Sequence, residues 1–159
     1  MNKTASHPRR RPSPSKIRKG VVERCLVGTL AKAAPKVSSA ELIQAVHDGL
    51  PVEELEVLQA SYQMPWEHLM PRLGLSKATL HRRKREGRLR PEESDRVVRY
   101  ARLLGRAIEV MGDRDTARRW LTSPQAGLGG EVPLDYAQTE VGAREVEDLL
   151  GRIEHGVYS

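Results

Sequence analysis

Apolar residues recur along most of the chain with the spacing of an α-helix. The clearest stripe, within residues 91–112, consists of Val97, Ala101, Leu104, Ile108 and Met111. A second stripe, near the end of the chain, consists of Val146, Leu149, Leu150, Ile153 and Val157. No run alternates between apolar and polar residues for long enough to indicate a β-strand. The pattern therefore predicts an all-α fold.

Glycine, proline and small polar residues divide this pattern into separate helices. We expect Ser39 to cap one helix that stops at Gly49, and Pro71 to shorten or kink another. The predicted helical segments are residues 39–49, 51–64, 65–74, 76–87, 91–112, 113–124, 134–138 and 141–156. A glycine-rich loop, QAGLGGEVP, interrupts the last part of the series.

The composition suggests four parts along the chain. Residues 1–20 contain three prolines, three serines and no apolar periodicity, which predicts a disordered basic arm. Residues 21–37 are predicted to be a poorly defined linker or loose helix. We expect a first helical domain over residues 38–112 and a second, small helical domain over residues 113–159.

The net charge of +6 hides segments of opposite sign. Residues 1–20 carry seven basic residues and no acidic one, and residues 77–90 carry seven basic residues and one acidic one. Residues 131–159 carry two basic and seven acidic residues, a net charge of −5. Cationic segments suit polyanions, nucleic acid foremost, and the change of sign indicates two different partners.

Residues 65–90 have the local pattern of a helix–turn–helix. Gly74 can adopt the positive φ that ends one helix and turns the chain sharply. Ser76 is a good N-cap for the next helix. Leu80 is the one large apolar residue of that second helix, so it should face the core and leave the opposite face exposed.

The face opposite Leu80 has the residue types that a recognition helix uses. Small N-terminal side chains allow close approach to base edges, and arginine makes bidentate contacts with guanine. The candidate DNA-binding residues are Ser76, Lys77, Ala78, Thr79, His81, Arg82, Arg85 and Arg88. The residues nearer the flanks, which suit phosphate groups, are Arg83, Lys84, Arg88 and Arg90. The alternative for such a basic run is a solvated face on an ordinary helical hairpin.

Two stretches resemble known antitoxin families. The first, PRLGLSKATLHRRKREGRLRPEESDRVVRYARLL, looks very like a segment of the Xre-type (lambda-repressor-like) antitoxins. It implies an all-α helix–turn–helix domain that binds operator DNA as a dimer. The second, residues 120–159, resembles the toxin-binding domain of the Xre/MbcA/ParS antitoxin family. The residues that carry the second match are Trp120, Leu121, Pro124, Leu128, Gly129, Gly130, Pro133, Leu134, Asp135, Thr139, Gly142, Val146, Leu149, Leu150, Arg152, Ile153 and Gly156.

The second resemblance implies a partner toxin with a RES domain, a NAD-consuming enzyme whose active-site entrance the antitoxin's C-terminal segment covers. Gly129 and Gly130 allow a backbone bend, and Thr139 can cap the final helix. We expect the apolar stripe of that helix to pack within the protein and to leave the end of the chain for the toxin. The candidate toxin-binding residues are Arg152, Glu154, His155, Val157, Tyr158 and Ser159.

Other chemistry has little support in the sequence. The five histidines are scattered without metal-ligand spacing, so we expect no metal site and no cofactor. No phosphate-binding loop or nucleophile motif is visible, and we expect no enzymatic activity. The single Cys25, the missing secretory signal and the lack of an apolar run of about 18 residues indicate a cytoplasmic protein without a membrane partner. The resemblance to antitoxins implies that its cell is prokaryotic.

Three functions fit these features. The first is an antitoxin that neutralises a RES-type toxin and represses its own operon. The alternatives are a plain transcriptional regulator whose C-terminal domain serves only dimerisation, and an interaction module that no longer binds DNA. We expect at least a homodimer, because recognition helices read half-sites in pairs. The helix over residues 92–111 and the C-terminal stripe also offer more apolar surface than one small domain needs.

Overall fold

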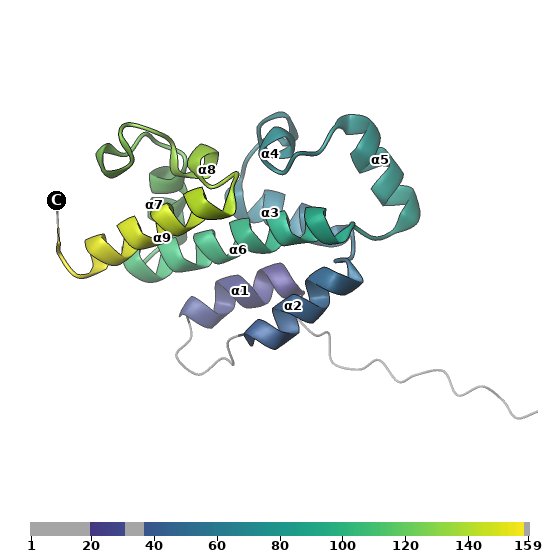
Figure 1. The fold of residues 1–159 in the computed structure, drawn as a ribbon, viewed down its shortest axis with the longest axis horizontal. Helices are drawn as coiled ribbons and strands as arrows, with labels where there is room; N and C mark the ends of the chain where they lie inside the picture. Colours follow the sequence, from purple (N-terminus) through teal and green to yellow (C-terminus); the bar gives the residue numbers. More distant parts are fainter. Residues whose placement is uncertain (1–19, 31–36, 158–159) are drawn as a thin grey trace, which may run out of the picture.

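The structure is a computed structural model and describes residues 20–30 and 37–157. Within these residues the chain forms nine α-helices and one 3-10 turn, and no strand (Figure 1). The helices are α1 (Val21–Leu30), α2 (Ser39–Asp48), α3 (Glu53–Tyr62), α4 (Trp66–Arg72), α5 (Lys77–Glu86), α6 (Pro91–Met111), α7 (Arg114–Leu121), α8 (Pro133–Tyr136) and α9 (Glu140–Glu154), with the 3-10 turn η1 (Ala126–Leu128) between α7 and α8. The predicted all-α fold is confirmed. The predicted basic arm, up to residue 19, and the candidate residues Tyr158 and Ser159 lie outside the described residues.

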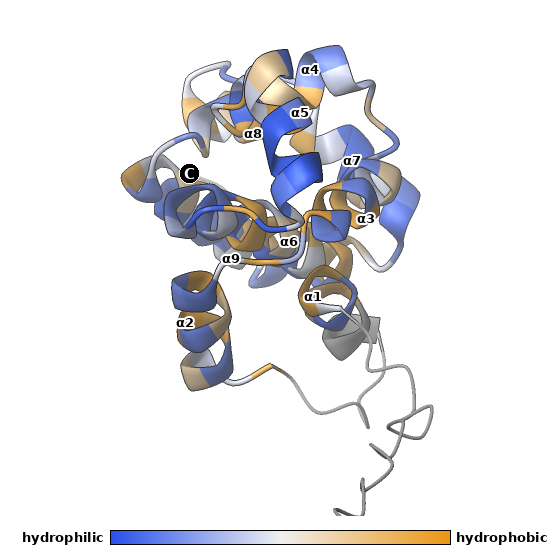
Figure 2. Ribbon diagram, turned by 90° about the vertical axis from the view of Figure 1, so that its right-hand side faces the viewer, coloured by the Kyte–Doolittle hydropathy of each residue, from blue (hydrophilic) through white to orange (hydrophobic). Residues whose placement is uncertain are grey.

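Helix α6 runs through the centre of the molecule, with α1 and α2 on one side and α4, α5 and α8 on the other (Figures 1 and 2). Its predicted stripe is buried from Val97 to Ile108. Other faces of α6 are buried as well, including Val98, Leu103 and Ala107. Because the chain itself encloses this helix, the expectation that α6 offers spare apolar surface for a dimer is wrong.

Tyr100 in the middle of α6 connects the two predicted domains. The hydroxyl of Tyr62, at the end of α3, donates to the backbone oxygen of Tyr100 at 2.7 Å. The hydroxyl of Tyr100 in turn donates to the backbone oxygen of Leu134 in α8 at 2.8 Å. Burial raises the pKa of both tyrosines, so both stay neutral donors. The buried apolar residues of the N-terminal and C-terminal halves also belong to one core around α6.

Helix α1 packs against α6 through the buried Val22 and Leu26. Its first turn is held by Glu54 of α3, whose carboxylate accepts from the backbone N–H groups of Val21 at 2.8 Å and Val22 at 3.0 Å. A carboxylate there also suits the positive end of the helix dipole. The first ten residues of the segment 21–37 therefore form a defined helix, and residues 31–36 lie outside the described part.

The helix ends follow the expected capping chemistry, with one shift. Ser38, not Ser39, caps α2: its Oγ accepts from the N–H of Glu41 at 3.2 Å, and the Glu41 carboxylate accepts from the N–H of Ser38 at 2.9 Å. This reciprocal pair is a capping box, which Glu41 specifies because it stands three residues after Ser38. Thr139 caps α9 by accepting from the N–H of Gly142 at 3.1 Å.

Candidate functional site

The turn between α4 and α5 places the second helix of the helix–turn–helix. Gly74 has a φ of +64°, and a Cβ there would lie 2.8 Å from Nη1 of Arg96, which donates to the backbone oxygen of Leu73. Both the backbone conformation and the available space therefore favour glycine. Leu75 is buried under the turn, and the Oγ of Ser76 accepts from the N–H of Thr79 at 3.1 Å.

Helix α5 presents a strongly polar face to solvent and faces the viewer in Figure 2. Leu80 on its other side is half-buried against the core. The candidate DNA-binding residues with exposed side chains are Ser76, Lys77, Ala78, His81, Arg82, Arg85 and Arg88, while Thr79 is half-buried. The structure thus gathers the candidates on one helix and its ends. Their contact with DNA stays a prediction.

Arg83 is on the buried side of α5, with 2% of its side chain exposed. Its Nε donates to Oε2 of Glu93 at 2.7 Å, its Nη2 to Oε1 of Glu93 at 3.0 Å, and its Nη1 to Glu86 at 2.6 Å. The expectation that Arg83 contacts phosphate is wrong, because its guanidinium is used inside the protein. Arg83 and Leu80 are three residues apart, so they share one face of the helix. This spacing distinguishes Arg83 in the sequence from its exposed basic neighbours.

Arg83, Glu86 and Glu93, here called the Arg83 cluster, join α5 to the first turn of α6. Burial opposes the ionisation of Glu93, but hydrogen bonds from Arg83 and from the backbone N–H of Arg90 outweigh it and hold the pKa of Glu93 below its ordinary value. The hydrogen bond to Glu93 also raises the pKa of Arg83. Both shifts favour the charged forms, so Arg83 and Glu93 are both charged at neutral pH.

Two flanking cations have partners on the protein surface. Lys84 Nζ lies 3.5 Å from Glu56 of α3. Arg88 remains exposed, and its Nη1 donates to the backbone oxygen of Gly49 at 2.7 Å. This bond fixes the Arg88 side chain beside the C-terminal end of α2 and close to the recognition helix.

The apolar stripe of α9 is buried at Val146, Leu149 and Leu150 and half-buried at Ile153. After α9, Gly156 has a φ of +67°, and the N–H of Val157 donates to the backbone oxygen of Arg152 at 2.8 Å. The chain therefore turns back at the end of the helix and leaves Val157 54% exposed. Among the candidate toxin-binding residues, Glu154 and His155 are exposed and Arg152 is half-buried.

Several acidic residues of the C-terminal segment pair with arginines of α6. Arg99 Nε lies 3.5 Å from Glu140, and an Nη of Arg102 lies 3.9 Å from Glu147. Arg106 donates to both carboxylate oxygens of Glu154. That hydrogen bonding lowers the pKa of Glu154. In the free protein the Glu154 carboxylate is therefore bonded to Arg106 of α6.

A groove of about 620 Å³ lies beside the end of α9. Its walls come from α6, α7, η1 and α9, and its apolar lining includes Met111, Trp120, Leu149 and Ile153. Arg152 and Val157 also line it. Its residues come from separate parts of the chain, so no local sequence pattern indicates this groove.

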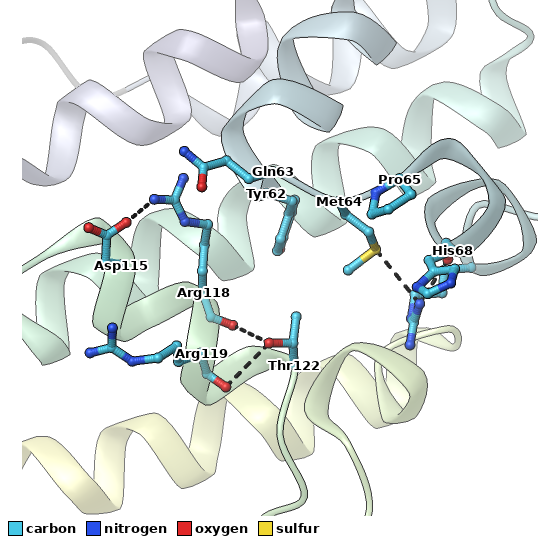
Figure 3. A pocket seen from close by; sticks show the side chains of 10 residues that line it. Tyr62, Gln63, Met64, Pro65, His68, Asp115, Arg118, Arg119 and Thr122 are labelled. Atoms are coloured by element: carbon cyan, nitrogen blue, oxygen red, sulfur yellow. Dashed lines mark hydrogen bonds and ion pairs between the residues drawn. The ribbon is translucent and has the colours of Figure 1, made fainter.

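A second cleft, of about 430 Å³, lies between the start of α4 and α7 (Figure 3). Its arginines already have partners within the chain. Arg118 pairs with Asp115 and donates to the backbone oxygen of Ser61 at 3.1 Å, and Arg72 donates to the backbone oxygen of His68 at 2.8 Å. Of these contacts, the bond from Arg118 to Ser61 joins α7 to α3. We assign no ligand to the cleft.

The parts of the chain that carry these two surfaces are each similar to a known protein family. The profile of the antitoxin Xre-like helix-turn-helix domain matches residues 41–102, and the profile of the antitoxin Xre/MbcA/ParS C-terminal toxin-binding domain matches residues 106–156. A relative named Antitoxin Xre, from Yersinia enterocolitica, is 34% identical over 127 residues, which are 79% of this chain and 86% of the relative. The chain belongs to the Xre antitoxin family.

Further relatives agree with this assignment. An Antitoxin Xre from Photorhabdus laumondii is 32% identical over 127 residues, with the same coverage of 79% and 86%. A protein named Prs ADP-ribosylating antitoxin, from a Sphingobium species, is 28% identical over 138 residues, 80% of this chain and 87% of the relative. The exposed face of α5 lies in the part that matches the Xre-like helix–turn–helix, and the groove beside α9 lies in the part that matches the toxin-binding domain, apart from Val157.

Neither a cluster of potential metal ligands nor a membrane-spanning helix occurs in the described part of this Xre antitoxin. Its residues include no group of three or more histidine, cysteine, aspartate or glutamate side chains arranged to hold a metal ion. None of the helices in that part combines the length and the apolar character that crossing a membrane requires. Its two assigned functional regions are a helix–turn–helix and a toxin-binding domain.

Proposed function

We propose that this Xre antitoxin neutralises a RES-type, NAD-consuming toxin with its C-terminal domain and represses its own operon by binding operator DNA with α5. The observation that carries the proposal is the presence, in one chain, of an exposed basic face on α5 and a toxin-binding domain. One relative has ADP-ribosylation in its name, a reaction that consumes NAD, so an enzyme of this kind is the partner to test first. The protein acts in the prokaryotic cytoplasm as a homodimer or a higher oligomer, without catalytic activity of its own.

In the DNA complex, α5 lies in the major groove. Arg82 and Arg85 on its exposed face reach guanine edges, while Ser76 to Thr79 at its N-terminus allow close approach to the bases. Arg88, held beside α2, contacts a phosphate.

The DNA test uses a duplex from the promoter of the chain's own operon and a scrambled duplex of equal length. Arg82→Ala should cost about 1–3 kcal/mol on the operator and reduce the preference over the scrambled duplex. Arg88→Ala should weaken both duplexes alike and reduce the slope of affinity against salt by about one. Arg144→Ala, an exposed arginine on α9, is the matched control. If neither α5 variant differs from this control in a mobility-shift assay, the DNA-binding role is wrong.

On the toxin side, residues 152–159 occupy the mouth of the NAD pocket. The buried part of the α9 stripe supplies a firm base, and Gly156 turns the chain away from the helix axis. Tyr158 offers a large contact area at low cost in conformational entropy. The blocking segment therefore consists of the last residues of α9 and the short tail beyond it, and the rest of the domain holds it in place.

Truncation after His155 tests the tail. The shortened protein should fold and bind operator as the full chain does, because Gly156 and Val157, where the removed segment begins, are exposed. It should fail to stop NAD consumption by the neighbouring RES-type toxin and fail to protect cells that express it. Full protection by the truncated form would contradict the blocking role. An operator-binding protein that never binds the toxin, even at full length, would instead be a plain transcriptional regulator.

A further inference from the structure

The groove beside α9 is apolar along its walls and open to solvent at the end of the helix. Met111, Trp120, Leu149 and Ile153 supply its apolar lining. Gly127 also lines it, and a Cβ there would lie 2.6 Å from Cδ1 of Leu149. The groove is thus shaped by close packing around it, yet no side chain of the described residues fills it.

Arg152 brings a half-buried guanidinium with one unpaired donor to this apolar surface. Its Nε is sealed from solvent and has no hydrogen-bond partner, although the side chain lines the groove. Glu154, two residues further along α9, is held by Arg106 instead, and Asp148, one turn before Arg152, lies on the same side of the helix but forms no ion pair with it among the described residues. A buried donor without an acceptor is unfavourable, and a guanidinium pairs best with a carboxylate. The chemistry that completes this groove is therefore an apolar side chain next to a carboxylate.

We propose that the groove binds a segment of the partner toxin in which an apolar side chain stands beside an aspartate or glutamate. The proposal rests on the toxin-binding function proposed above and specifies its contact. The groove lies within the matched toxin-binding domain apart from Val157 at its rim, so its occupant is continuous with that interface. The carboxylate pairs with Arg152, and the apolar side chain covers Trp120 and Ile153.

The groove and the tail have separate roles in this arrangement. The N–H of Val157 bonds to the backbone oxygen of Arg152, so the tail leaves the protein at the rim of the groove. A toxin segment bound in the groove brings the toxin surface directly against the tail. The groove supplies affinity, whereas the tail supplies the block of the active site.

The test measures binding of full-length variants to the RES-domain protein encoded beside this chain's gene, made by cell-free synthesis and immobilised for interferometry. Arg152→Gln should weaken binding by about 30-fold or more, mainly through faster dissociation, because it removes one partner of a buried charged pair. Ala126→Trp, which fills the groove from η1, should weaken binding by about tenfold. Arg144→Gln, 75% exposed on the same helix and outside the groove, should change affinity by no more than about twofold.

Two further measurements separate the possible results. Arg152→Lys should retain more affinity than Arg152→Gln, and raised salt should weaken the wild type more than Arg152→Gln, as a charged pair requires. Wild-type affinity in both groove variants, with thermal unfolding unchanged, overturns the proposal. If Ala126→Trp loses binding and Arg152→Gln does not, the proposed pairing of a toxin carboxylate with Arg152 is wrong. A wild-type protein that does not bind this toxin refutes the proposed function itself, whereas a truncated tail that still binds through the groove supports the separate roles.

Discussion

At the scale of single residues, Arg83 decides how α5 is attached to the rest of the protein. It is the one fully buried residue of that helix, and its guanidinium lies between Glu86 and Glu93. Leu80 adds half-buried apolar contact, and Lys84 adds a surface ion pair. A helix that enters the major groove of DNA, as proposed for α5, needs a fixed orientation. The buried Arg83 cluster contributes to that orientation.

Removing one member of the Arg83 cluster should destabilise the protein strongly. Arg83→Met leaves the buried carboxylate of Glu93 without its main partner, so the free energy of unfolding in urea should fall by about 3 kcal/mol or more. Arg83→Met combined with Glu93→Leu should recover much of that loss, because no buried charge remains unpaired. Arg82→Met, exposed on the same helix, should stay within about 0.5 kcal/mol of the wild type. Equal stability of Arg83→Met and Arg82→Met would show that the cluster is dispensable.

The same cluster predicts a pH dependence. The pKa of Glu93 is lower in the folded than in the unfolded chain, so its contribution to stability is complete above the unfolded value of about 4.3. It is lost as the pH falls through the lower, folded value. The difference in unfolding free energy between wild type and Glu93→Gln should therefore be constant near neutral pH and shrink in acid. A difference that stays constant down to acid-induced unfolding would contradict this ionisation.

At the scale of helices, α1 depends on one carboxylate from α3. Glu54→Ala removes the acceptors of two N–H groups in the first turn, which should lower the unfolding free energy by about 1–3 kcal/mol. Hydrogen exchange along α1 should accelerate more than exchange in α9. Glu53→Ala, exposed and one residue earlier in α3, is the control. Equal exchange in the two variants would mean that packing of Val22 and Leu26 alone holds the helix.

Local pattern was enough to predict the helices whose evidence lies within a few residues. The stripes of α6 and α9 and the caps at Ser76 and Thr139 belong to this group. Helix α1 was indistinct because its anchor, Glu54, is 33 residues away from Val21. The groove beside α9 was missed for the same reason, since four separate elements form it. The many basic residues around Arg83 suggested a phosphate contact. Its position three residues after Leu80 instead places it on the buried face of α5.

At the scale of the whole molecule, the alternation of basic and acidic segments is partly an internal arrangement. Arginines 99, 102 and 106 of α6 face acidic residues of α9, so a share of the charge on the C-terminal segment is neutralised within the chain. Exposed ion pairs of this kind add little stability individually. Among the described residues, exposed basic side chains gather on α5, near one end of α6, and the unpaired Nε of Arg152 lies in α9 close to its C-terminal end, near the other end of α6 (Figure 1).

If α5 reads DNA as proposed, one chain reads one half-site. Because operators of this kind have two half-sites, we predict a dimer. Light scattering at micromolar concentration should give at least twice the 17.8 kDa of the single chain. A footprint on the operator should show two half-sites with centres about 34–36 Å apart, or a multiple of that distance, on one face of the duplex. The contact between the two copies has to use surface other than the α6 stripe, which is buried within each chain. Arg82→Ala should keep the dimer mass while it weakens the footprint at both half-sites equally, because a two-fold axis relates them. A single protected half-site together with the mass of one chain, with and without operator, would refute the dimer.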